Sequence, residues 1–494
     1  MLELKPYQFW FVVGSQHLYG EEKLQEVREN SKRMAEELNK LGILPYTIQF
    51  KGVLSKAEEI SQLTKEANNE DACAGLITWM HTFSPGKMWI AGLTSFQKPL
   101  LQFHTQYHQN LPWGQIDMDF MNLHQSAHGD REYGYTLTRL RIPRKVVSGY
   151  WKSKNVQRRI ADWMSTAVAF VESSSIRVAR FGDNMRNVAV TEGDKIEAQI
   201  KFGWTVDTFG VGNLVDRIEE VSETQVDQLY HEYVELFDID SNGLEAIPFR
   251  RAIKEQARIE LGIRSFLVEG NYSAFTTNFE ELHGLKQLPG LAVQRLMADG
   301  YGFGAEGDWR TSALTRLLKI LSANQCTSFM EDYTYHLFPE NELILGSHML
   351  EVCPTIAVNK PKVLVHPLSI GGKEDPARLV FDGKEGKGIV ASLVELGGRY
   401  RLIVNEIEAV SPMEETPHLP VAKVLWKPLP SFTTSTEAWI YAGGAHHTVF
   451  SLALTKEQLF DLADMFQIEC IVIDHNTDIL RLKQELRINE VIYR

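Results

Sequence analysis

Segments typical of buried strands alternate with segments typical of helices at the start of the chain, and this alternation constrains the fold more than any other feature. Apolar runs that suit strands occur at residues 9–13, 46–50, 74–79 and 99–103. Between them, apolar residues recur at helical spacing at residues 21–41, 56–68 and 85–93. This order predicts a parallel sheet with helices on both faces.

Ligands on such sheets bind at the carboxyl ends of the strands. Three polar loops follow the predicted strands there, at residues 14–20, 80–85 and 104–109. We therefore expect these loops to form one binding edge.

Two further regions follow the first, and the pattern changes from one to the next. The second again mixes strands (176–180, 273–279) with helices (212–221, 225–237, 246–261). After about residue 327, short runs rich in β-formers indicate a largely antiparallel domain, with two late helices at residues 455–466 and 478–486; the runs include 362–366, 389–395, 400–406, 421–426 and 438–442. We predict an α/β protein with domains at residues 1–175, 176–326 and 327–494.

Composition excludes several classes of function. Acidic residues outnumber basic ones, 64 to 51, and the net charge of -13 disfavours a nucleic-acid partner. The four cysteines lie far apart, without a CxxC pair, as expected of free thiols in a reducing compartment. The apolar run at residues 9–13 is too short for a signal peptide, and no stretch approaches the ~20 residues of a membrane span. These features predict a cytoplasmic protein without a membrane partner.

Two possible nucleotide motifs fail on their context. The segment GSQHLYGEE, from residue 14, lacks the G-K-[ST] ending of a phosphate loop and carries two glutamates. The segment GFGAEG, residues 302–307, follows a predicted helix, whereas a dinucleotide fingerprint follows a strand. We expect no nucleotide cofactor.

The segment from 302 to 307 instead places one carboxylate, Glu306, on a glycine-rich loop. Asp308 then suits the N-cap of a helix over residues 309–323. A solvated turn glutamate is the simpler interpretation, but Phe303 and Trp309 make the neighbourhood apolar. A carboxylate held there would be a metal ligand or an acid/base group.

The next segment suits two strands joined by a turn at residues 339–340. Pairing Phe338 with Asn341 and counting back along both strands puts Glu331 opposite His348. Cross-strand neighbours on one face can share a metal ion, although a register slip of one residue would separate them. An exposed acidic hairpin is the alternative, disfavoured because several of its side chains need a core.

Adjacent histidines in the segment YAGGAHHTVF, residues 441–450, complete the set. If this stretch is extended, only one of His446 and His447 can reach a given metal ion. Together with Glu306, Glu331 and His348, that histidine would suit a divalent ion such as Mn²⁺, Co²⁺, Mg²⁺ or Zn²⁺. The carboxylates favour Mn²⁺ or Mg²⁺ over a structural Zn²⁺.

These residues, together with stretches along the whole chain, resemble the L-arabinose isomerase family. The similar stretches include WFVVGSQHLYG (10–20), HTFSPGKMW (81–89), RFGDNMRNVAVTEGDK (180–195), GYGFGAEGDW (300–309), TSFMEDYTYH (327–336), GSHMLEVCP (346–354) and AGGAHHTVFS (442–451). The resemblance implies a three-domain fold shared with fucose isomerases, with a barrel-like C-terminal domain. It also implies interconversion of L-arabinose and L-ribulose with Mn²⁺ as the usual metal, and D-galactose and D-tagatose as a possible second pair.

Roles of single residues come from the same resemblance. It implies four metal ligands, Glu306, Glu331, His348 and His447, with the two glutamates also forming the acid/base pair of an ene-diol proton transfer; a hydride shift on the same ligands stays open. His446 would contact the sugar. The remaining substrate-binding positions would be Gln16, Leu18, Phe83, Gln125, His128, Met185, Phe279, Tyr333 and Ile370.

The resemblance further implies a homohexamer or homotetramer. Gln16 and His128 would then reach the site of a neighbouring subunit, unless the domains of one subunit fold onto one another. Two rival functions remain: a metal-dependent aldolase or hydrolase on sugar derivatives, and a sugar sensor without turnover. An aldolase or hydrolase acting on phosphorylated sugars would need a cationic phosphate-binding cluster, and none occurs near the proposed ligands. A sensor would have no need of both glutamates.

Overall fold

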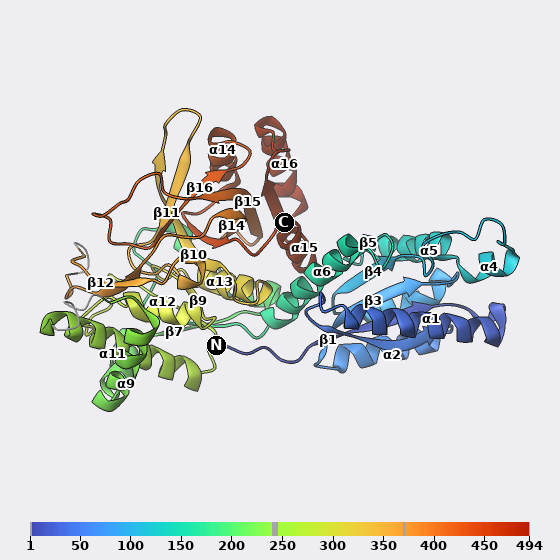
Figure 1. Cartoon of the computed structure of the whole chain (residues 1–494), viewed down its shortest axis with the longest axis horizontal. Coiled ribbons are helices and arrows are strands. Elements are labelled where there is room, and N and C mark those ends of the chain that lie inside the picture. The colour runs from blue at the N-terminus through green and yellow to red at the C-terminus, as the bar shows by residue number, and fades with distance from the viewer. Residues whose placement is uncertain (1, 240–245, 369–371, 494) are drawn as a thin grey trace. The chain divides into compact units, whose positions relative to one another are not determined.

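The computed structural model describes residues 2–239, 246–368 and 372–493. The chain divides into two compact units, one of residues Glu3–Val171 and the other of Glu172–Arg494 with the first two residues. Each of three sheets forms the centre of a domain: a parallel sheet in the first unit, and a parallel sheet and a barrel in the second (Figure 1). No helix in the described part of the chain has the length and apolar character needed to cross a membrane.

The first unit is the α/β domain that the alternating pattern predicts. Its sheet has the order β2-β1-β3-β4-β5, all parallel. Its strands are β1 Gln8–Gly14, β2 Thr47–Leu54, β3 Cys73–Met80, β4 Leu100–His104 and β5 Lys145–Ser148; its helices are η1 His17–Tyr19, α1 Gly20–Lys40, α2 Ala57–Asn69, η2 Gly86–Trp89, α3 Ile90–Ser95, α4 Met118–Leu123, α5 Ser126–Arg139 and α6 Lys154–Ser173.

Alternate residues of β1 face opposite layers of helices. Trp10 and Val12 belong to a core with residues of α2, α3 and α5, whereas the ring of Phe9 lies 5.1 Å from that of Trp163 on α6. Because β1, β3 and β4 are neighbours, the three polar loops that follow them meet at one edge, as predicted.

The central domain has a smaller parallel sheet of order β7-β6-β8-β9. Its strands are β6 Arg177–Phe181, β7 Thr205–Phe209, β8 Ala274–Thr277 and β9 Gly302–Gly304; its helices are η3 Ala189–Thr191, α7 Lys195–Phe202, α8 Val211–Glu219, α9 Glu223–Leu236, α11 Ile247–Glu269, α12 Gly290–Ala298 and α13 Trp309–Leu321. Every residue of α13 is buried, because this helix packs against both the central sheet and the barrel strands.

The C-terminal domain closes into a barrel, since β14 pairs with β17 at one end of its sheet and with β15 at the other. The cycle is β14-β17-β10-β11-β16-β15, all antiparallel, and β18 adds to β15 in parallel. The elements are β10 Thr327–His336, β11 Leu343–Ser347, η4 Pro354–Ile356, β12 Lys362–Val365, β13 Ala377–Val380, β14 Gly386–Glu395, β15 Tyr400–Val410, β16 Lys423–Pro428, α14 Phe432–Ala442, β17 His447–Ser451, α15 Lys456–Phe466, β18 Glu469–Ile473 and α16 Ile479–Ile492.

The prediction of a strand at residues 438–442 of the barrel domain is wrong. Residues 438–442 end helix α14, which Ser431 caps by accepting a hydrogen bond from the Thr434 amide. Gly443 ends the helix in the left-handed conformation. The apolar run fits a helix because Ala438 and Ala442 are buried one turn apart while Ile440 and Tyr441 between them are exposed.

Candidate metal and sugar site

Glu306 lies in the tight turn between β9 and α13, at the carboxyl edge of the central sheet. Its side chain is 19% exposed, and its backbone has a φ of 61°. Asp308 caps α13, as predicted, by accepting a hydrogen bond from the Thr311 amide at 2.9 Å. The short strand and the capped helix thus fix the turn from both sides.

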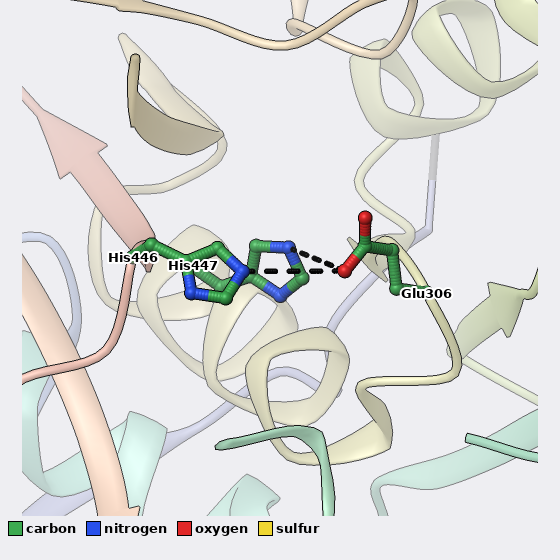
Figure 2. A group of neighbouring side chains, drawn as sticks. All are labelled: Glu306, His446 and His447. Atoms are coloured by element: carbon green, nitrogen blue, oxygen red, sulfur yellow. Dashed lines mark ion pairs between the residues drawn. The ribbon is translucent and has the colours of Figure 1, made fainter. Parts of the chain in front are cut away.

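Both histidines of the pair approach the Glu306 carboxylate (Figure 2). Oε2 of Glu306 lies 3.8 Å from Nε2 of His447 and 4.0 Å from Nε2 of His446. Strand β17 begins at His447, so His446 precedes the strand and the alternation of side chains does not separate the two. Among the residues that the structure describes, these three form the group whose ligand atoms all lie within 4.8 Å of one another.

The side chains of Glu331 and His348 lie close together as expected, but the strands pair in a different register. Glu331 pairs with Ser347, not His348, because the strands shift between Asp332 and Thr334. A β-bulge there makes Tyr333 an extra residue, so the count back from the turn fails by one. His348 follows the end of β11, and its Nε2 still lies 3.9 Å from Oε2 of Glu331.

Phe329 joins the two pairs into one cluster. Its ring packs edge-on against His348 and His447, with centroid distances of 5.1 and 5.2 Å. The two imidazoles lie 6.3 Å apart, and Glu331 is the β10 neighbour of His447 in the barrel. The predicted ligands Glu306, Glu331, His348 and His447 therefore lie in one cluster, although Glu331 and His348 are outside the 4.8 Å group that Glu306 forms with His446 and His447.

Two acidic residues that the sequence did not assign to the site orient these imidazoles. Nδ1 of His447 lies 3.0 Å from Oδ2 of Asp308, and Nδ1 of His348 lies 2.5 Å from Oε2 of Glu351. When the imidazole is neutral, such a carboxylate holds its proton on Nδ1 and leaves a lone pair on Nε2. Nε2 of His447 is buried and has no hydrogen-bond partner among the described residues.

The charges in the cluster stabilise one another. Burial alone would raise the pKa of Glu306, but the three neighbouring imidazoles outweigh it and lower that pKa. Burial would lower the pKa of His348, yet the surrounding carboxylates, led by Glu351, raise it. The Glu306 carboxylate raises the pKa of His446. The site thus keeps Glu306 ionised, which metal ligation requires.

The candidate sugar-binding residues of the first unit gather at the carboxyl edge of its own sheet. Oε1 of Gln125 accepts hydrogen bonds from the Tyr19 hydroxyl at 2.6 Å and from the Phe83 amide at 3.3 Å. The ring of His128 stacks on Phe83 at 5.1 Å. The η1 turn starts after Gln16 and leaves Leu18 82% exposed on the same edge.

The other candidates lie in the second unit. Met185 is next to the cluster, since its amide donates to the Glu306 carbonyl at 2.9 Å. Phe279 packs against the core of the central domain, and Tyr333 is 44% exposed on β10. Ile370 lies outside the described residues.

Comparison with known proteins shows one family along the chain. Three domain models match in order: L-arabinose isomerase N-terminal domain over residues 3–175, central domain over 177–324 and C-terminal domain over 326–469. L-arabinose isomerases of Geobacillus stearothermophilus and Clostridium beijerinckii are 61% and 58% identical over 494 residues, covering 100% of both chains. The protein of that name from Halalkalibacterium halodurans is 59% identical over 494 residues, covering 100% of this chain and 99% of its own.

Proposed function

The chain belongs to the L-arabinose isomerase family, and we propose that it converts L-arabinose to L-ribulose at the cluster around Glu306. As a member of this family it is an isomerase, which sets aside the hydrolase, aldolase and sensor alternatives. The observation that carries the proposal is that the buried Nε2 of His447, beside the Glu306 carboxylate, has no hydrogen-bond partner in the described part of the chain.

A divalent metal ion fits the residues of this cluster. We propose Glu306, Glu331, His348 and His447 as its ligands, with Mn²⁺ as the native ion and Co²⁺ or Mg²⁺ as substitutes. Both imidazoles already have Nδ1 fixed by a carboxylate, the usual arrangement of metal-bound histidines. When bound, the ion would supply Lewis-acid polarisation of the sugar carbonyl and stabilise negative charge on its oxygen atoms. No nucleotide cofactor is needed, since isomerisation involves no net redox change.

The two glutamates would carry the proton transfers. We assign removal of the C2 proton and its return to C1 to Glu306, and proton movement between O1 and O2 to Glu331. The lowered pKa of Glu306 keeps its carboxyl group ionised, which is the form that can accept a proton. His446, half exposed beside Glu306, would donate a hydrogen bond to the sugar. A hydride shift would use the same residues.

The sugar-binding residues support a wider proposal. Met185, Phe279 and Tyr333 would line the site from the same subunit, and Ile370 stays a proposed substrate-binding residue from the family resemblance. Gln16, Leu18, Phe83, Gln125 and His128 would line it from a neighbouring subunit of a homohexamer or homotetramer. D-galactose would be a second substrate, giving D-tagatose, because apolar walls discriminate weakly against one added hydroxymethyl group.

The four free cysteines support a cytoplasmic location.

Ketose formation from L-arabinose by metal-stripped protein, with and without added Mn²⁺, tests the proposal. We expect activity to return with Mn²⁺ and to be absent from Glu306→Ala. Glu340→Ala is a matched control, because Glu340 also has a positive φ, of 65°, but lies exposed at the β10–β11 turn. Metal-loaded wild-type protein without ketose formation would refute the function, and an active Glu306→Ala protein would refute the site.

A further inference from the structure

Glu306 occupies a turn whose backbone suits other residues better. The Asp308 amide donates to the Ala305 carbonyl at 2.9 Å, and the two residues between them have φ values of 61° for Glu306 and 77° for Gly307. Turns with two positive φ angles favour glycine, which has no Cβ to crowd the backbone carbonyl, and asparagine and aspartate, whose side chains hydrogen-bond locally. Gly307 meets this demand and Glu306 does not. The surroundings must therefore hold the turn.

The loop after β6 supplies much of what holds it. The Met185 amide donates to the Glu306 carbonyl at 2.9 Å, and Nδ2 of Asn184 donates to the Gly307 carbonyl at 3.2 Å. On the other side, the Gly307 amide donates to the Thr277 carbonyl of β8 at 3.1 Å. Both peptide groups after Glu306 are thus fixed by neighbouring segments.

Asn184 is the one side chain among these contacts, and its carboxamide is itself fixed at both ends. Its Oδ1 accepts a hydrogen bond from Arg180, and Nδ2 also donates to the Thr191 carbonyl. Asn184 is 6% exposed, so water cannot easily replace it. A Cβ on Gly307 would lie 2.7 Å from the Asn184 Cα, so the two segments touch.

We propose that Asn184 is a positioning residue for the catalytic carboxylate: its amide holds the strained turn in the one geometry that aims Glu306 at His446 and His447. The inference rests on the proposed function of Glu306 as ligand and base. Residues kept in strained backbone conformations need surroundings that over-determine them, and such strain gathers at functional sites. Loss of the Asn184 amide would let the turn relax and move the carboxylate away from the imidazoles.

Two variants and one control test this role. Asn184→Ala removes the amide, and Asn184→Asp keeps its shape but places an oxygen against two carbonyls. Asn187→Asp is the control, because Asn187 lies exposed in the same loop with a φ of 66° and receives the same charge change. The readouts are kcat and KM for L-arabinose, the calorimetric Kd for Mn²⁺, and Tm.

We expect both Asn184 variants to lose about 10–100-fold in kcat, with a smaller change in KM, because a displacement of about 1 Å is enough for such a loss. The Kd for Mn²⁺ should rise about 10-fold, as it does when groups that orient ligands are removed. Asn187→Asp should match wild type in all readouts. Folded Asn184 variants with unchanged kcat and Kd would overturn the proposal.

Loss of the cooperative unfolding transition in both Asn184 variants would also overturn it, since Asn184 would then support the fold as a whole. Equal losses in the Asn187→Asp control would overturn it too. If wild-type protein binds Mn²⁺ but forms no ketose from L-arabinose, the proposed function fails. The Mn²⁺ affinities of the variants would still test Asn184 in that case, so the two failures are distinguishable.

Discussion

Replacing Asp308 by asparagine should weaken metal binding by forcing His447 into the wrong tautomer. In the native protein, Oδ2 of Asp308 accepts a hydrogen bond from Nδ1 of His447 at 3.0 Å, and Oδ1 accepts one from the Thr311 amide of α13 at 2.9 Å. Asparagine keeps the capping oxygen but turns its NH₂ group towards Nδ1. Nδ1 of His447 must then accept a hydrogen bond, and the ring must carry its proton on Nε2, where the metal would bind.

The structure sets the size of this effect. Asp308 and His447 are both 0% exposed, so water cannot replace the lost contact. A hydrogen bond to a charged group contributes about 1.5–3 kcal/mol, which corresponds to the roughly 10–100-fold loss of affinity expected when the partner of a metal-bound histidine is changed. We expect a Kd for Mn²⁺ raised by that factor.

Calorimetric titration with Mn²⁺ measures the Kd of the variant relative to wild type, and Tm on the same samples separates a loss of binding from a loss of folding. Asp478→Asn is the matched control, because Asp478 caps α16 in the same way at the surface, accepting the Arg481 amide at 2.9 Å. A folded Asp308→Asn protein that binds Mn²⁺ as tightly as the Asp478→Asn protein would refute the tautomer argument.

Three further predictions concern Glu351, Glu306 and His81. Glu351→Gln should raise the Kd for Mn²⁺ about 10-fold in the same titration, because it removes the negative charge from the acceptor of His348 Nδ1; an unchanged Kd would remove Glu351 from the site. Glu306→Gly and Glu306→Ala should both be inactive, but the glycine variant should be more stable to denaturant by about 1 kcal/mol, since glycine accepts a φ of 61° without the strain that alanine has there; equal stabilities would contradict this. Burial lowers the pKa of His81 to about 4, so the unfolded chain takes up a proton near pH 6.5 and the folded chain does not. The free energy of unfolding should therefore fall as the pH is lowered from 7 to 5, by about 2 kcal/mol. Denaturant unfolding of His81→Gln should show a smaller fall than wild type; an equal fall would exclude His81 as the cause.

Local pattern predicted much of the fold because it reports on contacts within each element. The strand at residues 9–13 became β1, and the helix after it became α1 with Gly42 in a left-handed conformation at its end. Asp308 was identified as an N-cap because capping involves only the next three residues. The same locality limited the site, since Asp308 and His447 are far apart in sequence and meet only when α13 packs against the barrel.

The sequence by itself determined the alternating domains, the glycine-rich turn that carries Glu306 and the residue types of the candidate metal site. The tertiary structure decided how they meet. The bulge at Tyr333 moved Glu331 opposite Ser347, which no count along two strands can reveal, because a bulge depends on barrel curvature as well as on local preference. Asp308 became the partner of His447 only because α13 packs against the barrel, whereas Glu351 reaches His348 from three residues along the chain. The chemistry of a side chain follows from the sequence, but a partner atom from a distant segment depends on long-range contacts.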